Sequence, residues 1–232
     1  MDDLQQRWLL ALSAPMVAIN PGADYAEPRF YADGQFIDLR DAWTIENREQ
    51  LLEMLRRMSD GGHAQNLNDA YWQAQRLLPS QWRELLYGLT EEERVNYQYA
   101  AQTLGECGPG GIRAWDLGRM GFLLRIGLLN DWINESENLW LQARLAVRAR
   151  HYYDSWASYL AGFQIGRAYW KCLGNAVAER ALYISRMGSD PAMLTMQREL
   201  DMHFSAPLRE LPWELALELP EKPLSLEEFT WS

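Results

Sequence analysis

Apolar residues recur at three- and four-residue spacing along most of this chain, a pattern typical of helices that bury one face. The spacing is plain in residues 51–58 and stops at Gly61-Gly62. Capping sequences mark further helix starts, because Thr90 stands three residues before Glu93 and Asn134 three before Glu137. We therefore predict an all-α fold.

The helical pattern predicts that residues 1–205 form one domain, a multi-helix orthogonal bundle of about eight to ten helices. The predicted helices cover residues 4–13, 44–60, 68–77, 80–87, 91–104, 113–129, 135–153, 155–173, 175–187 and 191–204. Residues 206–232 form an acidic, proline-containing tail, which we expect to pack on this domain or trail from it.

Two segments depart from the helical pattern. Asp33-Gly34 lies between pairs of strand-forming residues, so we expect a short β-hairpin near residues 30–37. The glycine-rich segment 105–111 lacks the lysine and the Ser/Thr of a phosphate-binding loop and follows a helix. We interpret it as a hinge or sharp turn.

Charged residues interrupt the apolar stripes of two predicted helices. In helix 155–173, one face carries Trp156, Leu160, Phe163, Arg167 and Trp170. A guanidinium placed in a buried stripe requires an acidic partner or an anionic ligand, because burying it unpaired is costly.

Helix 113–129 has the same construction, with Arg119 in the gap of its apolar stripe. Trp115 belongs to that stripe, and Asp116 lies three residues before Arg119, so it is a natural counter-ion for Arg119 or Arg167. One reading is a buried salt bridge that fixes helix register; the other is an arginine pair that holds a carboxylate or phosphate in a cleft.

Composition narrows the classes of function. The net charge of −10 disfavours binding to nucleic acid or to anionic lipid, and no run of about 20 apolar residues predicts a membrane span. The two cysteines lack CxxC spacing, and two aspartates replace the positive start of a signal peptide. We expect a cytoplasmic protein whose eleven tryptophans form an aromatic core, a groove or both.

Candidate chemistry is sparse. The three histidines, at positions 63, 151 and 203, lack metal-ligand spacing, so we predict no metal site, and no motif predicts a cofactor. His63 is a candidate general base if the fold brings it beside Asp116; otherwise it is a polar residue at a helix terminus.

The tryptophan and charge pattern resembles the bacterial domain-of-unknown-function family 1266. The resemblance lies in 114-AWDLGR-119, 137-ENLW-140, Ser155-Trp156 and 166-GRAYW-170, with Gly62-His63 upstream. It covers about residues 8–190, so we expect the tail beyond 205 to be peculiar to this chain. The resemblance implies a helical, cytoplasmic bacterial protein with Trp115, Asp116, Arg119, Trp156, Gly166, Arg167 and Trp170 as signature residues, and it implies no reaction.

Two functions remain open. The acidic charge and the absence of catalytic spacing favour a non-catalytic protein-binding module, for example of the inhibitor or immunity type. The alternative is an enzyme or small-ligand binder that holds a small anionic ligand at Arg119 and Arg167, with Asp116 or His63 handling protons.

Overall fold

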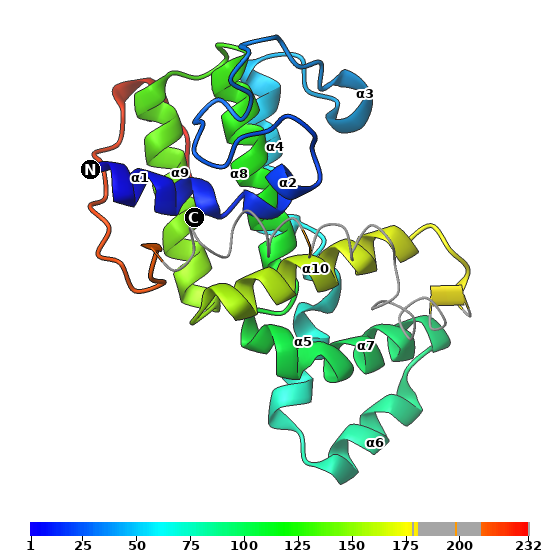
Figure 1. Ribbon diagram of the computed structural model, residues 1–232. Coiled ribbons are helices and arrows are strands. Elements are labelled where there is room, and N and C mark those ends of the chain that lie inside the picture. Colours follow the sequence, from blue (N-terminus) through cyan, green and yellow to red (C-terminus); the bar gives the residue numbers. More distant parts are fainter. Residues whose placement is uncertain (178, 181–197, 199–209, 232) are drawn as a thin grey trace. The chain divides into compact units, whose positions relative to one another are not determined.

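Helices are the regular elements of the computed structural model, which describes residues 1–177, 179–180, 198 and 210–231 (Figure 1). They are α1 (Asp3–Ala11), α2 (Ala14–Ala18), α3 (Arg40–Trp43), α4 (Arg48–Gly61), α5 (Gln65–Arg76), α6 (Pro79–Gly88), α7 (Glu91–Cys107), α8 (Arg113–Leu129), α9 (Glu135–Tyr152) and α10 (Trp156–Cys172), with short 3-10 turns η1 (Gly108–Gly110) and η4 (Leu224–Leu226). No strand occurs in this part of the chain, so the predicted all-α class is confirmed.

The helices from α4 to α10 lie close to their predicted positions. Thr90 caps α7 as predicted, since its hydroxyl accepts a hydrogen bond from the Glu93 N–H. Near the N-terminus, Pro15 lies in the first turn of α2 rather than only ending a helix. The predicted domain boundary at 205 and His203 lie outside the described residues. So do the predicted helix 191–204, apart from residue 198, and the part of helix 175–187 beyond Arg180.

The predicted hairpin near residues 30–37 is wrong. The backbone of Ile37 pairs with a side chain instead of a strand, because the Asn130 amide accepts from the Ile37 N–H at 3.0 Å and donates to the Ile37 carbonyl at 2.8 Å. Phe30 adopts a φ of 71° and is fully buried against Phe122. The segment therefore folds as an irregular loop held by side chains.

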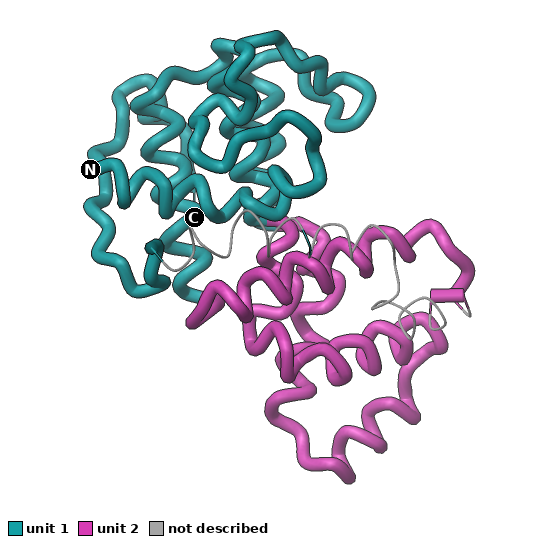
Figure 2. Tube along the Cα trace, in the orientation of Figure 1, with its two compact units in different colours: residues 1–60, 117–151, 196–232 teal, residues 61–116, 152–195 magenta. Residues whose placement is uncertain are grey.

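The chain forms two compact units (Figure 2): unit 1 comprises residues 1–60, 117–151 and 196–232, and unit 2 comprises residues 61–116 and 152–195. In unit 2, α5 and α10 both pack on α7. Two buried tyrosine hydroxyl groups form hydrogen bonds between these helices. Tyr71 on α5 shares a hydrogen bond of 2.7 Å with Thr103 on α7, and Tyr99 donates to the Ile165 carbonyl on α10 at 2.6 Å.

In unit 1, residues 210–231 pack on helices α1 and α9. Trp8 donates to the Pro212 carbonyl at 3.0 Å, and its ring lies 5.3 Å from that of Trp213. Arg150 on α9 covers the Trp8 ring and donates to the Leu215 carbonyl at 2.6 Å. The described part of the tail is thus anchored by aromatic burial and by hydrogen bonds to its backbone carbonyls.

Candidate functional site

Asp116 binds the chain segment that leads into α5. Its carboxylate accepts the backbone N–H groups of His63 at 3.1 Å and Ala64 at 2.9 Å. The residue is only 5% exposed. A Cβ on Gly62 would lie 2.5 Å from the carboxylate, so glycine is required there for the close approach. Asp116 acts here as a cap that satisfies two N–H groups near the start of α5.

His63 is brought beside Asp116. Its Nδ1 lies 3.5 Å from Asp116 Oδ1, and its side chain is 27% exposed. An imidazole next to a carboxylate is an arrangement that can orient a ring for hydrogen bonding or proton transfer. Both residues belong to unit 2.

Trp115 on α8 packs against two aromatic residues of α10, Phe163 and Trp170. The Trp115 ring lies 5.1 Å from Phe163 and 5.5 Å from Trp170. Gly166 permits this contact, since a Cβ there would lie 2.4 Å from the Trp115 Cβ. Trp115 is buried, whereas Trp170 remains 44% exposed. These contacts therefore hold one tryptophan ring at the surface of unit 2.

Arg167 stands one turn before Trp170 on α10. Its Nε and Nη1 atoms are buried and have no hydrogen-bond partner, and it makes no ion pair with any described residue. The expected ion pair between Asp116 and Arg167 is therefore not formed within the described structure. Two N–H-bearing atoms of this guanidinium are left without an acceptor.

The remaining predicted residues lie elsewhere. Arg119 belongs to unit 1, is 8% exposed and lies with its guanidinium carbon 5.4 Å from the centre of the Trp43 ring. Trp156 begins α10 in unit 2 and packs edge-on against Tyr159 at 6.0 Å. The structure thus joins His63 with Asp116, and Trp115 with Trp170, and places Arg167 beside the second pair.

Arg125, a fully buried arginine in α8, was not predicted as a site residue from the sequence. Its guanidinium donates to the Ser13 hydroxyl at 2.9 Å, to the Glu27 carbonyl at 2.6 Å and to the Asp24 carbonyl. Burial lowers the pKa of Arg125 to about 9, so the group stays cationic at neutral pH. The signal was present, since Arg125 is the one charge within an otherwise apolar run of α8 from Met120 to Leu129.

A second buried charge, Glu137, joins three segments of unit 1. Arg48 on α4 binds its carboxylate through two hydrogen bonds of 2.9 and 2.6 Å, and Ser225 of the C-terminal segment donates at 2.6 Å. The predicted capping box is also formed, because Glu137 accepts from the Asn134 N–H at 2.9 Å. Spacing revealed the cap, but it could not reveal the distant partners.

No group of three or more histidine, cysteine or carboxylate side chains in the described residues could hold a metal ion. The two cysteines, Cys107 and Cys172, are free and buried, and burial raises the pKa of both thiols. None of the helices that the structure describes is long and apolar enough to cross a membrane.

Residues 38–213 match the family model described as Protein of unknown function (DUF1266). The chain belongs to the DUF1266 family. It is similar to two Escherichia coli (strain K12) proteins: "Uncharacterized protein YbeU", 39% identical over 98% of both chains, and "Uncharacterized protein YbeR", 43% identical over 74% of both chains. No solved structure matches it.

DUF1266 membership confirms the family predicted from the sequence. The match with YbeU extends over almost the whole chain, so the expectation that the segment beyond residue 205 is peculiar to this chain is wrong. The structure also explains why two positions quoted in the resemblance are glycine. Gly62 makes room for the Asp116 carboxylate, and Gly166 makes room for Trp115.

Proposed function

We propose that this DUF1266 protein is a non-catalytic protein-binding module, and that Arg167 and Trp170 on α10 are central contact residues for its partner. The observation that carries the proposal is the pair of buried, unpartnered nitrogen atoms of Arg167, one helical turn from a tryptophan that is 44% exposed.

Arg167 requires hydrogen-bond acceptors from outside the described structure. A buried N–H without an acceptor costs about 1–3 kcal/mol, and more when the group is charged. A carboxylate can accept two parallel N–H groups from a guanidinium, so a partner side chain of this type would remove the cost on binding. The missing acceptors favour a role for Arg167 in binding a ligand over a role in stabilising the fold.

Trp170 supplies apolar area beside this charge. Its ring packs against that of Trp115, so little side-chain entropy is lost when a partner covers it. Tryptophan and arginine are the residues most enriched at the energetic centres of protein interfaces. The net charge of −10 favours a partner with a positively charged surface overall, and Arg167 selects an acceptor group within it. Inhibitors and immunity proteins are binding modules of this kind.

The alternative is a small-ligand binder that takes a phosphate or carboxylate compound at Arg167. The same unpartnered nitrogen atoms favour it, because they do not distinguish a free anion from a carboxylate on a protein. The exposed Trp170 ring favours the protein partner, since a small anion would leave it uncovered.

Photo-crosslinking tests the proposal. A benzophenone amino acid replaces Trp170 in the full chain, produced in Escherichia coli, which is the source of both relatives. We expect a discrete adduct with one other protein that is lost in Arg167→Met and kept in Arg56→Met, which changes an exposed arginine paired with Glu53. The same group placed at Tyr87, which is 90% exposed, controls for random collision.

Two results would count against the protein partner. One is an adduct that forms equally well at positions 170 and 87, or that survives Arg167→Met. The other is the absence of any adduct together with a rise in melting temperature in phosphate or acetate that Arg167→Met abolishes, which would support the small-ligand alternative.

A further inference from the structure

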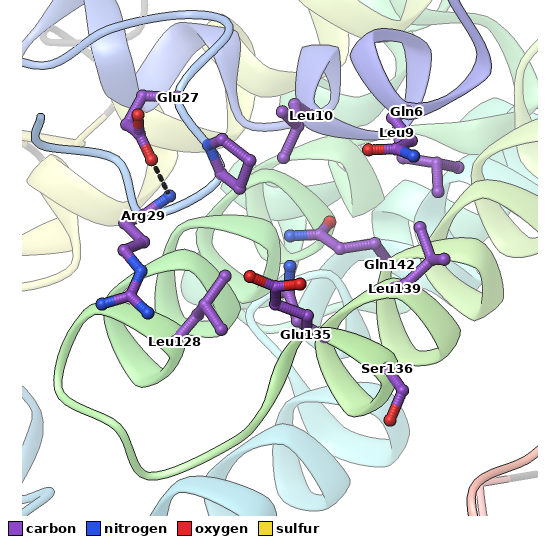
Figure 3. Close-up of a pocket in the computed structure, with 12 residues that line it drawn as sticks. Gln6, Leu9, Leu10, Glu27, Arg29, Leu128, Glu135, Ser136, Leu139 and Gln142 are labelled. Carbon is purple, nitrogen blue, oxygen red and sulfur yellow. Dashed lines mark hydrogen bonds between the residues drawn. The ribbon is translucent and has the colours of Figure 1, made fainter. Parts of the chain in front are cut away.

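Unit 1 contains a cavity of about 520 Å³ that the sequence did not predict (Figure 3). It is bordered by α1, the loop at residues 27–29, the end of α8 and the first turns of α9. We propose that this cavity binds a small cationic amine with a short hydrocarbon chain, and that Glu135, Asn138 and Gln142 accept hydrogen bonds from its ammonium group.

Two buried amide oxygens in the cavity wall have no hydrogen-bond partner. They are Oδ1 of Asn138, which is 6% exposed, and Oε1 of Gln142, which is 1% exposed. The Gln142 amide is oriented by its nitrogen, which donates to the Gly121 carbonyl at 3.2 Å and leaves the oxygen as the unused acceptor. Buried acceptors of this kind are normally satisfied, so the cavity is suited to a ligand that brings N–H donors.

A carboxylate completes the acceptor set. Glu135, Asn138 and Gln142 stand at positions i, i+3 and i+7 of α9 and so share one helix face. Figure 3 shows the Glu135 carboxylate and the Gln142 amide directed toward the middle of the cavity. An ammonium group carries three donors and no acceptor, which matches three oxygen acceptors on one side.

Charge also favours a cation over an anion. Among the described lining residues, two carry carboxylates, Glu27 and Glu135, and one is a cation. That cation, Arg29, lies 3.7 Å from the Asp131 carboxylate. An anionic ligand would be repelled by this excess of negative charge. The two unpartnered amide oxygens could not stabilise it, because an oxygen of this kind accepts hydrogen bonds and donates none.

Four leucines supply an apolar part of the wall. Leu9, Leu10, Leu128 and Leu139 contribute to it, and the first three are buried. In Figure 3 these leucine side chains surround the carboxylate and amide groups. Such a wall favours a hydrocarbon chain attached to the amine over a fully hydrated cation.

This inference is independent of the proposed function, since it rests on other residues and on unit 1 alone. Isothermal titration calorimetry of the full chain with pentylamine at neutral pH tests it. We expect saturable binding in roughly the millimolar range or tighter, as is reasonable for so small a ligand. The neutral analogue 1-pentanol and the anionic analogue pentanoate should bind at least about tenfold more weakly.

Matched variants locate the site. Glu135→Gln and Asn138→Leu should each weaken pentylamine binding by about tenfold or more, because each removes an acceptor of a charged donor. Glu221→Gln makes the same charge change at an exposed residue that does not line the cavity, and should leave affinity within about twofold. Equal binding of 1-pentanol, an equal loss in Glu221→Gln, or no saturable heat with pentylamine would overturn the inference.

Discussion

Asp116 illustrates how one buried carboxylate can position a helix start. It accepts the N–H groups of His63 and Ala64, and the chain passes so close that the preceding residue, Gly62, has no room for a Cβ. The acid that the sequence suggested as a counter-ion thus binds backbone groups. Its sequence neighbours Trp115 and Arg119 gave no indication of this, because the contact joins residues more than fifty positions apart.

We predict that Gly62→Ala lowers the free energy of unfolding by about 1–3 kcal/mol, since the new methyl group must displace the Asp116 carboxylate. Gly105→Ala is the matched control. It lies within α7 with nothing near its Cβ position, so it should be neutral or stabilise by up to about 1 kcal/mol through helix propensity. Urea unfolding followed by tryptophan fluorescence measures both. A Gly62→Ala protein as stable as Gly105→Ala would contradict this account of Asp116.

Arg125 shows the opposite use of a buried charge. Its guanidinium satisfies two loop carbonyls and one hydroxyl, so it serves as a scaffold for residues 24–27. We predict that Arg125→Lys costs about 2–4 kcal/mol, because an ammonium group cannot reproduce the fork of donors. Arg56→Lys changes an exposed pair and should cost less than about 1 kcal/mol. Thermal melts of the two variants give the comparison, and similar losses would refute the scaffold role.

At the scale of elements, Glu137 connects α4, the start of α9 and the C-terminal segment. Burial disfavours its charged form, but hydrogen bonds from Arg48, Ser225 and the Asn134 N–H outweigh burial and lower the pKa of Glu137. Because the pKa is lower in the folded than in the unfolded protein, this stabilisation is complete above the unfolded pKa of about 4.3 and is lost as the pH falls through the folded value.

We therefore predict that Glu137→Gln reduces the free energy of unfolding at neutral pH and makes it less dependent on pH between about 5 and 3 than in the wild type. Glu53→Gln, which breaks an exposed pair on α4, should leave both the stability and its pH dependence nearly unchanged. Urea titrations across this pH range provide the measurement. An acid response in Glu137→Gln identical to that of the wild type would exclude Glu137 as its source.

The sequence predicted the helices well because their signals are local. Apolar spacing, the Thr90 and Asn134 caps and the glycine breaks act within a few residues of one another. The hairpin prediction was wrong because it also used only a local signal, the turn sequence Asp33-Gly34. That signal could not reveal that the Asn130 side chain would take the place of a strand. Asp116 and Arg119 are buried, whereas Trp170, which the sequence placed in a buried stripe, is 44% exposed. The partners of the charged residues depended on tertiary structure.

At the scale of the whole molecule, the buried charges of the described residues differ in how many hydrogen bonds the fold gives them. Glu137 and Arg125 are bound by several described groups, whereas Arg167 retains two buried nitrogen atoms without a partner. The net charge of −10 does not explain Arg167, because charges that promote solubility lie at the surface, whereas Arg167 stands in an apolar stripe of α10. A guanidinium whose buried N–H groups find no acceptor within the fold is expected to serve binding.

The most direct test of this claim is the free energy of unfolding of Arg167→Met relative to the wild type, measured by urea titration. Methionine fills a similar space without charge, so we expect a variant that is as stable as the wild type or more stable by about 1–2 kcal/mol. A loss of more than about 2 kcal/mol would show that Arg167 supports the fold, and would contradict its assignment as a residue reserved for a partner.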